Sequence, residues 1–210
     1  MIVVRSHTRE DYKPVWHAMQ HFTATRTSKT PDEIWFTEHS PVFTLGLKAS
    51  SKHLVKPGTI PVVRVDRGGQ VTYHGPGQLL VYPLIDLKRA NLTVRQLIMA
   101  LEQSVINFLE TFGVEGNTTG TVPGVYVDNQ KIASIGLRIK HGASFHGMAL
   151  NIDVELEPFT RINPCGFKNL VVTHLHSIGI HKKRKEVQAS IQKHLLRHLN
   201  MLDKPLIICD

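Results

Sequence analysis

"RGGQVTYHGPGQ", residues 67–78, carries four glycines, one proline and one histidine between two apolar runs. Glycine is used where the backbone must turn through positive φ or approach another group closely. "IPVVRVD" precedes this stretch and "QLLVYPLIDL" follows it, and both are typical of strands. The stretch therefore joins strand to strand, and a phosphate, a nucleotide or a long thin acyl chain are the candidates for what lies against it.

Two nucleotide-binding motifs are missing from this stretch. A phosphate-binding P-loop needs GxxxxGK[ST] between a strand and a helix, and residues 67–78 have neither the lysine nor the helix. The dinucleotide fingerprint GxGxxG is also missing, and without a following helix no helix dipole faces a pyrophosphate. The local residues favour a narrow, uncharged ligand, with a plain pair of structural turns as the alternative.

Hydrophobic periodicity predicts three helices along the chain. The first covers residues 9–27 with Thr8 as its cap, and the third covers residues 184–201. The second begins at Thr93, which forms a capping box with Gln96, and ends at Gly113. Its apolar face consists of Leu97, Leu101, Val105, Phe108 and Phe112.

Strands occupy most of the remaining chain. They are expected over "EIWFTEH" and "VFTLG" (33–46, broken at Pro41), in a hairpin over 124–140 that turns at Asp128-Asn129, and over "SFHGMALNI". Because strands and helices do not alternate strictly, the pattern predicts an α+β fold, with a mixed sheet flanked by helices. We expect a single domain over residues 1–210, of which about 181–210 form a C-terminal helical portion.

Composition limits the class of protein. The chain has 210 residues, 41% hydrophobic and 20% charged, with a net charge of +8. The first ten residues lack the apolar core of a signal peptide, and the longest apolar run, "LLVYPLI", is far shorter than the roughly 20 residues that span a bilayer. We expect a cytoplasmic protein with no membrane segment. The positive charge, densest in "HKKRK" at 181–185, favours an acidic partner: nucleic acid, an anionic membrane or an acidic protein.

The two cysteines differ in their surroundings. Cys165 lies in "RINPCGF", where proline stiffens the backbone before it and glycine frees the backbone after it. It is the candidate nucleophile, whereas Cys209 in "LIICD" fits a core-filling residue without a role. A nucleophilic cysteine needs a neighbouring cation that favours its thiolate form. The candidates are Lys131, His74, His146 and Lys168.

A cofactor is not expected. The cysteines form no CxxC pair, which argues against a cysteine-based zinc site. "HLH" at 174–176 leaves a histidine-based metal site open only if both imidazoles lie on one face of a strand.

Four segments in order carry a resemblance to a known family: "RGGQVTYHGPGQLLVYPLIDL", "GVYVDNQKIASIGLRIK", "SFHGMALNI" and "RINPCG". Together with "WFTEHSPVFTLG" they resemble the lipoyl(octanoyl) transferases over almost all of residues 30–180. That resemblance implies the α/β fold shared with biotin and lipoate protein ligases. It also implies transfer of an octanoyl group from acyl carrier protein to lysines of lipoyl domains, in 2-oxoacid dehydrogenases and the glycine cleavage H protein.

The resemblance also implies roles for individual residues. Cys165 occupies the acyl-thioester position and Lys131 the position of its basic partner. Three segments correspond to the lining of the acyl site: Arg67, Gly68, Gly69, Gln70, Val71, Thr72, Tyr73 and His74; Ser134, Ile135 and Gly136; and Gly147, Met148 and Ala149. "GLKA" (46–49) and "VVTHL" (171–175) depart from the family pattern, and neither includes the cysteine or the lysine.

The implied chemistry is ping-pong acyl transfer through a thioester on Cys165, without metal or other cofactor. Backbone N–H groups must also meet the oxyanion, and Gly75, Gly77 and the backbone near Lys131 are the candidates. The competing readings are an ATP-dependent lipoate or biotin protein ligase, a cysteine-dependent amidotransferase acting between carrier domains, and a basic nucleic-acid-binding module.

Overall fold

A computed structural model describes residues 1–120 and 122–209, and over these residues the strands form two sheets. The larger sheet has seven strands in the order β10-β1-β2-β6-β9-β8-β7. β1 is parallel to β10 and β2, and the other neighbours are antiparallel, so the predicted mixed α+β class is confirmed. Its strands are β1 (Ile2–Glu10), β2 (Asp32–His39), β6 (Gln78–Leu84), β7 (Gly124–Val127), β8 (Gln130–Lys140), β9 (Ala143–Asn151) and β10 (Leu206–Cys209).

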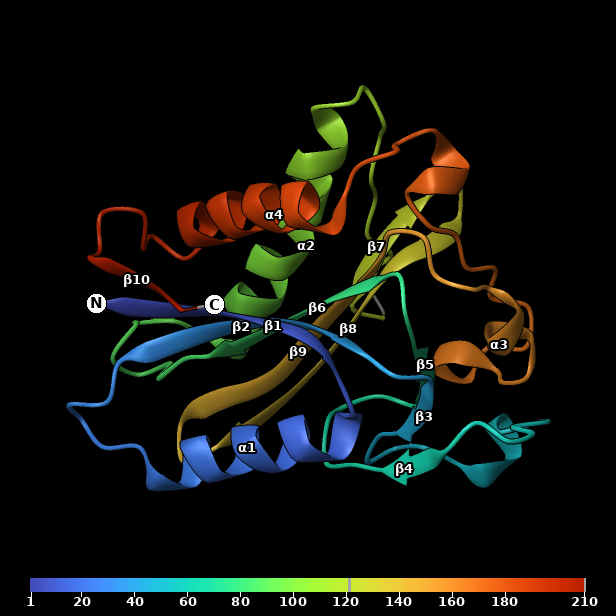
Figure 1. Ribbon diagram of the computed structural model, residues 1–210, viewed down its shortest axis with the longest axis horizontal. Helices are drawn as coiled ribbons and strands as arrows, with labels where there is room; N and C mark the ends of the chain where they lie inside the picture. Colours follow the sequence, from blue (N-terminus) through green and yellow to red (C-terminus); the bar gives the residue numbers. More distant parts are fainter. Residues whose placement is uncertain (121, 210) are drawn as a thin grey trace.

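Helices cover both faces of this sheet (Figure 1). The helices are α1 (Tyr12–Thr25), α2 (Val94–Glu110), α3 (Glu157–Thr160) and α4 (Arg184–His198), with short 3-10 turns η1 (Ser51–His53), η2 (Pro164–Gly166) and η3 (His176–Ile178). Successive residues of β2 point to opposite faces: Phe36 packs in the core with α2 and α4, and Trp35 packs with α1. Because both faces are covered, nearly every residue of the central strands β2, β6 and β9 is buried, polar residues included.

A small sheet extends the larger one at the side where β5 leads into β6 (Figure 1). It has the order β4-β3-β5, with β3 at Val42–Leu45, β4 at Val62–Arg64 and β5 at Val71–His74. β5 lies inside the glycine-rich stretch, so this stretch is a pair of turns around a short strand. The predicted break between β2 and β3 at Pro41 is confirmed.

The second helix and the hairpin follow the sequence pattern closely. The Gln96 N–H donates to Thr93 Oγ1 at 3.2 Å and the Thr93 N–H donates to Gln96 Oε1 at 2.8 Å, as the capping box predicts. Asp128 and Asn129 turn the hairpin with φ of 48° and 61°. Phe112 was expected on the buried face, but the helix ends at Glu110 and Phe112 is 40% exposed.

The start of the chain differs from the prediction. Residues 9 and 10 belong to β1, the helix begins at Tyr12, and its N-cap is Asp11 without a side-chain hydrogen bond. The predicted cap at Thr8 is therefore wrong. Ile2 and Val4 are fully buried, since β1 lies between β10 and β2, and this pairing extends the strand to Glu10.

The C-terminal segment contains more than the predicted helix. α4 is followed by β10, which pairs with β1 in parallel, so residues after about 200 join the main sheet. Cys209 is half-buried in this edge strand, whereas a core position was expected. Among the helices that the structure describes, none has both the length and the apolar character that crossing a bilayer requires.

Candidate active site

The loop that carries Cys165 has an unusual backbone. Cys165 itself has φ 56° and ψ 11°, the left-handed conformation that a residue with a Cβ rarely adopts. Gly166 follows with φ 87°, and its N–H donates to the Asn163 carbonyl at 2.9 Å. A left-handed non-glycine residue costs about 1–3 kcal/mol, and such strain gathers at functional sites. The half-buried thiol is thus held in place by a tight turn.

Both ends of this loop are tied down. The Asn163 N–H donates to the His53 carbonyl at 2.8 Å, which fixes the loop to η1. On the other side, the Lys131 N–H donates to the Val171 carbonyl at 2.8 Å and the Thr173 N–H donates to the Lys131 carbonyl at 3.0 Å. The "VVTHL" segment that departs from the family pattern therefore contacts the lysine directly, which its position in the sequence does not reveal.

Lys131 and Cys165 meet, although 34 positions separate them. Lys131 Nζ lies 3.3 Å from Cys165 Sγ and donates a second hydrogen bond to the Pro123 carbonyl at 3.1 Å. It also lies 5.2 Å from the centroid of the Tyr126 ring. Only 1% of Lys131 is exposed. A buried ammonium beside the thiol is the cation that a nucleophilic cysteine needs.

Cys165 lines a cavity of about 430 Å³, a volume typical of small-molecule sites. All three predicted lining segments border it, because Ser134, Ile135 and Gly136 on β8 pair with Ala149, Met148 and Gly147 on β9. The predicted residues that line it are Arg67, Gly68, Gly69, Gln70, Val71, Thr72, His74, Ser134, Ile135, Gly136, Gly147, Met148, Ala149 and Cys165.

Tyr73 is the exception among the predicted lining residues. Tyr73 does not line the cavity, whereas Thr72 and His74, on the other side of β5, do. Its ring packs against Phe43 and Phe159, at centroid distances of 5.6 and 5.4 Å.

Glycines are required where backbones meet below the cavity. The Gly68 N–H donates to the Leu137 carbonyl at 2.9 Å, and a Cβ on Gly136 would lie 3.0 Å from the Gly68 oxygen. A Cβ on Gly147 would lie 2.0 Å from the carbonyl oxygen of Val81. The glycine-rich stretch thus lies partly against strand β8 itself and partly against the cavity.

Arg67 places a guanidinium in the wall of this cavity. It donates to the Thr44 carbonyl at 2.7 Å, to Thr44 Oγ1 at 2.8 Å and to the Gly68 carbonyl at 2.9 Å. All these acceptors are neutral, and burial lowers the pKa of Arg67.

His74 links the cavity to the lysine through a chain of hydrogen bonds. His74 Nδ1 lies 3.1 Å from Gln78 Oε1, Gln78 Nε2 donates to Asn151 Oδ1 at 3.0 Å, and Asn151 Nδ2 donates to the Thr173 carbonyl at 2.8 Å. Thr173 pairs with Lys131. His74 is therefore buried in a structural network.

The remaining candidate cations are placed differently. His146 lines the cavity and hydrogen-bonds to Asp66, and Lys168 is exposed. Of the predicted oxyanion donors, the Gly77 N–H already donates to Glu38 Oε2 at 2.9 Å, and near Lys131 the N–H of the lysine itself donates to the Val171 carbonyl. Gly75 is not among the lining residues. The Gly77 N–H is therefore not free for an oxyanion, and a donor from the backbone near Lys131 stays a prediction.

Several lining residues were missed by sequence reasoning. They are Tyr12, Lys48, Leu80, Tyr82, Val94, Ile98, Val122, Pro123 and Leu137. Leu80 and Tyr82 share one face of β6, so the strand period alone indicates that they lie together. Tyr12, Val94 and Ile98 come from two helices whose sequences show only ordinary amphipathic character.

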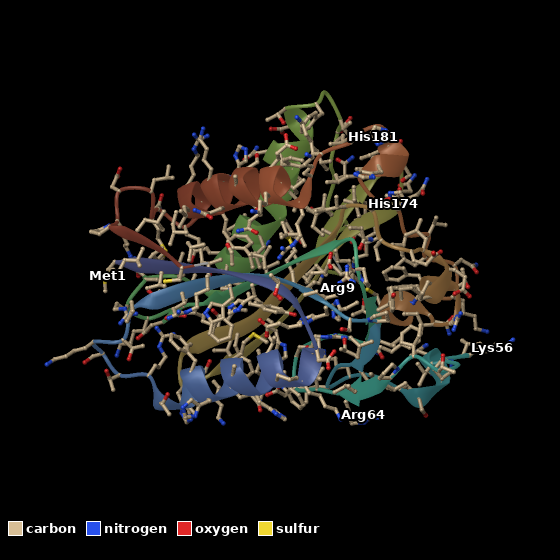
Figure 2. All side chains as sticks on the ribbon, in the orientation of Figure 1. Met1, Arg9, Lys56, Arg64, His174 and His181 are labelled. Carbon is tan, nitrogen blue, oxygen red and sulfur yellow. The ribbon has the colours of Figure 1, made fainter. Side chains whose placement is uncertain are left out.

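The histidines at 174–176 do not lie on a strand, which corrects that expectation. They lead into η3, where His176 Nδ1 is 3.2 Å from Asp153 Oδ1 and its ring is 5.0 Å from that of His181. His174 and His181 lie at one corner of the molecule (Figure 2). Over residues 1–120 and 122–209, no group of three or more histidine, cysteine, aspartate or glutamate side chains is arranged to hold a metal ion.

Comparison with known proteins assigns the family. The model of the lipoyl protein ligase A/B catalytic domain matches residues 11–196. A protein of Shewanella sp. (strain W3-18-1) called octanoyltransferase is 55% identical over 176 residues, 84% of this chain and 81% of that protein. The chain belongs to the lipoyl protein ligase A/B catalytic domain family. An octanoyltransferase of Shewanella pealeana is 50% identical over 201 residues, 96% of this chain and 91% of its own length.

Solved structures show that the family fold extends to ligases. A putative lipoate protein ligase from T. acidophilum, with bound lipoic acid, superposes with a TM-score of 0.75 at 13% identity, over 98% of this chain and 86% of that one. A biotin protein ligase from Aquifex aeolicus gives a TM-score of 0.57 at 14% identity, over 97% and 72% of the two chains. At these identities the likeness concerns the fold alone, and it confirms the predicted biotin/lipoate ligase-like architecture.

Proposed function

We propose that this protein transfers an octanoyl group to the lysine amine of lipoyl domains through a thioester on Cys165, with Lys131 as its basic partner. The observation that carries the proposal is the 3.3 Å contact between Lys131 Nζ and Cys165 Sγ at the edge of the cavity. The high identity to octanoyltransferases supports the acyl group, and the mainly apolar lining supports a saturated chain. The whole chain, residues 1–210, then acts as one catalytic domain.

The first half-reaction loads the cysteine. The Cys165 thiolate attacks the carbonyl carbon of the donor thioester, a new C–S bond forms, and the bond to the carrier's pantetheine sulfur breaks. Lys131 gives one proton to the departing sulfur, which leaves as a thiol. One thioester replaces another, so the step requires no ATP. The donor in the proposal is octanoyl-acyl carrier protein.

The second half-reaction restores the enzyme. The acceptor lysine amine attacks the octanoyl-Cys165 carbonyl, the amide bond forms, and the C–S bond breaks to return the thiolate. Neutral Lys131 takes the proton that the amine loses, so both groups regain their starting states. Amide formation makes this half favourable. The acceptors in the proposal are lipoyl domains of 2-oxoacid dehydrogenases and the glycine cleavage H protein.

The protein uses no metal or other cofactor in this scheme, and we place it in the cytoplasm. Both cysteines are free thiols, as a reducing compartment keeps them. An ATP-dependent ligase of the same fold is the competing function. Such a ligase activates the acyl group as an adenylate and has no use for a strained cysteine beside a buried lysine.

Mass spectrometry of the protein after incubation with octanoyl-acyl carrier protein, without ATP, tests the proposal. We expect an octanoyl adduct on Cys165. Cys165→Ser removes the thiol, so no octanoyl thioester should form at this position. Cys209→Ser is the matched control and should leave the adduct unchanged, because Cys209 lies in the edge strand β10. An adduct on Cys209, or transfer that requires ATP, contradicts the proposal.

A further inference from the structure

The cavity has a closed inner end made of four rings. Tyr12, His74, Tyr82 and His146 all line it, and their exposed fractions are 4%, 6%, 3% and 1%. Lys48 and Val94, which also line the cavity, are exposed, so the cavity opens to solvent beside them. Along the sheet, His146 pairs with Leu137, six positions after Lys131 on β8, a separation of roughly 20 Å at 3.3 Å per residue. That separation is between backbone positions; the Lys131 side chain reaches Cys165 from one end of β8 and the rings line the cavity from the other, so a chain attached to the thiol points its end toward the rings.

Hydrogen bonds fix the ring of Tyr12 at this inner end. His146 Nε2 lies 2.9 Å from Asp66 Oδ1, and His146 Nδ1 lies 3.2 Å from the Tyr12 hydroxyl. Asp66 also accepts from Trp16 Nε1 at 2.8 Å and from Gln20 Nε2 at 3.2 Å. Burial opposes ionisation of Asp66, but hydrogen bonds from His146, Trp16 and Gln20 outweigh it and hold its pKa below the usual range.

These bonds determine which atom carries each hydrogen. Because the Asp66 carboxylate can only accept, His146 Nε2 carries the hydrogen and donates it. His146 Nδ1 is then an acceptor, and the Tyr12 hydroxyl donates to it. Burial raises the pKa of Tyr12, which keeps this hydroxyl protonated. The polar atoms thus satisfy one another, and the Tyr12 ring is held as part of the cavity wall.

The backbone of His146 is strained to make this contact. Its φ is 57°, and within the described residues it is the only non-glycine residue inside a strand with a positive φ. Neighbouring side chains on a strand normally point to opposite faces, but the His146 ring stacks on that of Phe145 with centroids 5.0 Å apart. The strain turns the imidazole toward Tyr12 and Asp66, and strained residues of this kind gather at ligand clamps.

We propose that Tyr12, positioned by His146 and Asp66, limits the length of the acyl chain that the cavity accepts. This inference rests on the proposed function, in which the cavity holds the acyl group. A chain longer than the slot must displace the Tyr12 ring, which breaks its hydrogen bond and leaves a buried His146 nitrogen without a partner. Tyr12 and Asp66 are thus specificity-determining and positioning residues, and neither takes part in the chemistry.

Acylation of Cys165 by octanoyl- and decanoyl-pantetheine tests this inference, since these small thioesters require no carrier docking. Mass spectrometry gives the decanoyl-to-octanoyl ratio of the acylation rates. We expect Tyr12→Ala to raise the ratio about tenfold, which is what burial of two further methylene groups supplies. Asp66→Asn should raise it by a smaller factor. Its neutral amide oxygen accepts more weakly from His146 Nε2 than the carboxylate does, so the imidazole and the Tyr12 ring that it positions are held less firmly.

Asp32→Asn is the matched control. Asp32 is a buried carboxylate that accepts from Arg26 at 2.6 Å and Arg89 at 2.7 Å, and it does not line the cavity. Loss of this carboxylate should lower stability and leave the ratio unchanged. If Tyr12→Ala does not fold, as judged by circular dichroism, Asp66→Asn decides, because the Asp66 side chain is 27% exposed and its replacement keeps the shape.

The outcomes separate this inference from the proposed function. If the decanoyl-to-octanoyl ratio stays at the parent value in both Tyr12→Ala and Asp66→Asn while Cys165 is still acylated, the role of Tyr12 is overturned and the proposed function is not. If neither pantetheine thioester acylates the parent protein, the ratio is measured with octanoyl- and decanoyl-acyl carrier protein, and failure of these to acylate Cys165 overturns the proposed function and the chain-length role with it.

Discussion

Lys131 is a buried cation that no carboxylate balances. Its Nζ contacts the Pro123 carbonyl, the Cys165 sulfur and the face of the Tyr126 ring. Over the part of the chain that the structure describes, no aspartate or glutamate lies within ion-pair distance of it. Burying an unpaired charge costs several kcal/mol. A thiolate on Cys165 supplies the missing negative charge, so ionisation of the thiol and burial of the ammonium favour each other.

Replacing Lys131 therefore changes the reactivity of Cys165. In Lys131→Met the thiolate loses its counter-charge, and alkylation by iodoacetamide at neutral pH should slow by about tenfold, the effect of losing about 1.4 kcal/mol of thiolate stabilisation. Lys131→Arg keeps the charge but does not readily release a proton, so alkylation should partly survive while turnover with an acceptor lysine fails. The alkylation rate measured against pH, together with turnover, separates the two roles of the lysine.

Lys140→Met is the control for this pair of variants. Lys140 lies at the other end of β8 and is exposed, so its loss should leave both measurements at the parent values. An alkylation profile in Lys131→Met that matches the parent would remove Lys131 from the mechanism.

Three strands bring buried histidines to one junction. His39 ends β2, His74 ends β5 and His146 lies within β9, and all three contact Tyr12 of α1. The His39 and His74 rings lie 4.9 and 5.6 Å from the Tyr12 ring, and His146 bonds to its hydroxyl. Burial lowers the pKa of each histidine, that of His39 to about 4.

This junction makes the fold sensitive to mild acid. Each histidine has a folded pKa below its unfolded value of about 6.5, so between about pH 6.5 and about pH 4 the unfolded chain binds more protons. The free energy of unfolding should therefore fall as pH falls, by up to about 1.4 kcal/mol per pH unit for each histidine. Urea denaturation at a series of pH values measures this slope.

His39→Gln should remove the contribution of one histidine from the slope. An amide can keep the contacts with the Glu10 carbonyl and the Tyr82 hydroxyl, which lie 2.9 and 2.8 Å from the imidazole nitrogens, but it does not titrate. A slope equal to that of the parent would show that His39 is protonated alike in the folded and unfolded states.

The sequence predicts the elements that depend on residues close together in the chain. The Thr93–Gln96 cap and the Asp128-Asn129 turn depend on neighbours within a few positions, and both are found where the pattern places them. β1 and β10 depend on each other instead: Ile2 pairs with Leu206, at opposite ends of the chain. No periodicity within either segment reveals that partner, so the sequence places the first helix too early and predicts neither β1 nor β10.

The site shows the same limit at the scale of the molecule. The resemblance groups three lining segments, and the register of β8 with β9 brings two of them side by side. The contact of Lys131 with Cys165 depends on residues 171–173 pairing with the lysine backbone, a bridge that spans the sheet and an irregular loop. Tyr12 enters the cavity only because α1 packs across the sheet, and nothing in its own segment marks it.

Positive charge gathers beside the cavity on the small-sheet side. Residues 40–65 contain Lys48, Lys52, Lys56 and Arg64 and no aspartate or glutamate, and all four basic side chains are exposed. Lys56 and Arg64 extend from the end of the molecule that carries the small sheet (Figure 2). Lys48 lines the cavity, and His53 of the same segment contacts the Cys165 loop through Asn163. An acidic donor that docks on this segment delivers its thioester close to the thiol.

Docking of an acidic carrier should therefore depend on this segment and on salt. Exposed charges are screened as ionic strength rises, so salt should raise KM for octanoyl-acyl carrier protein and change single-turnover acylation from saturating carrier far less. Lys52→Glu should raise KM several-fold at low salt and weaken its salt dependence, since the reversed charge repels an acidic surface.

Lys185→Glu, on the exposed side of α4, makes the same charge change within the "HKKRK" run and serves as the control. If Lys185→Glu raises KM as much as Lys52→Glu, net charge attracts the carrier and the segment beside the cavity has no special part. A KM that does not respond to salt at all contradicts electrostatic docking on either surface.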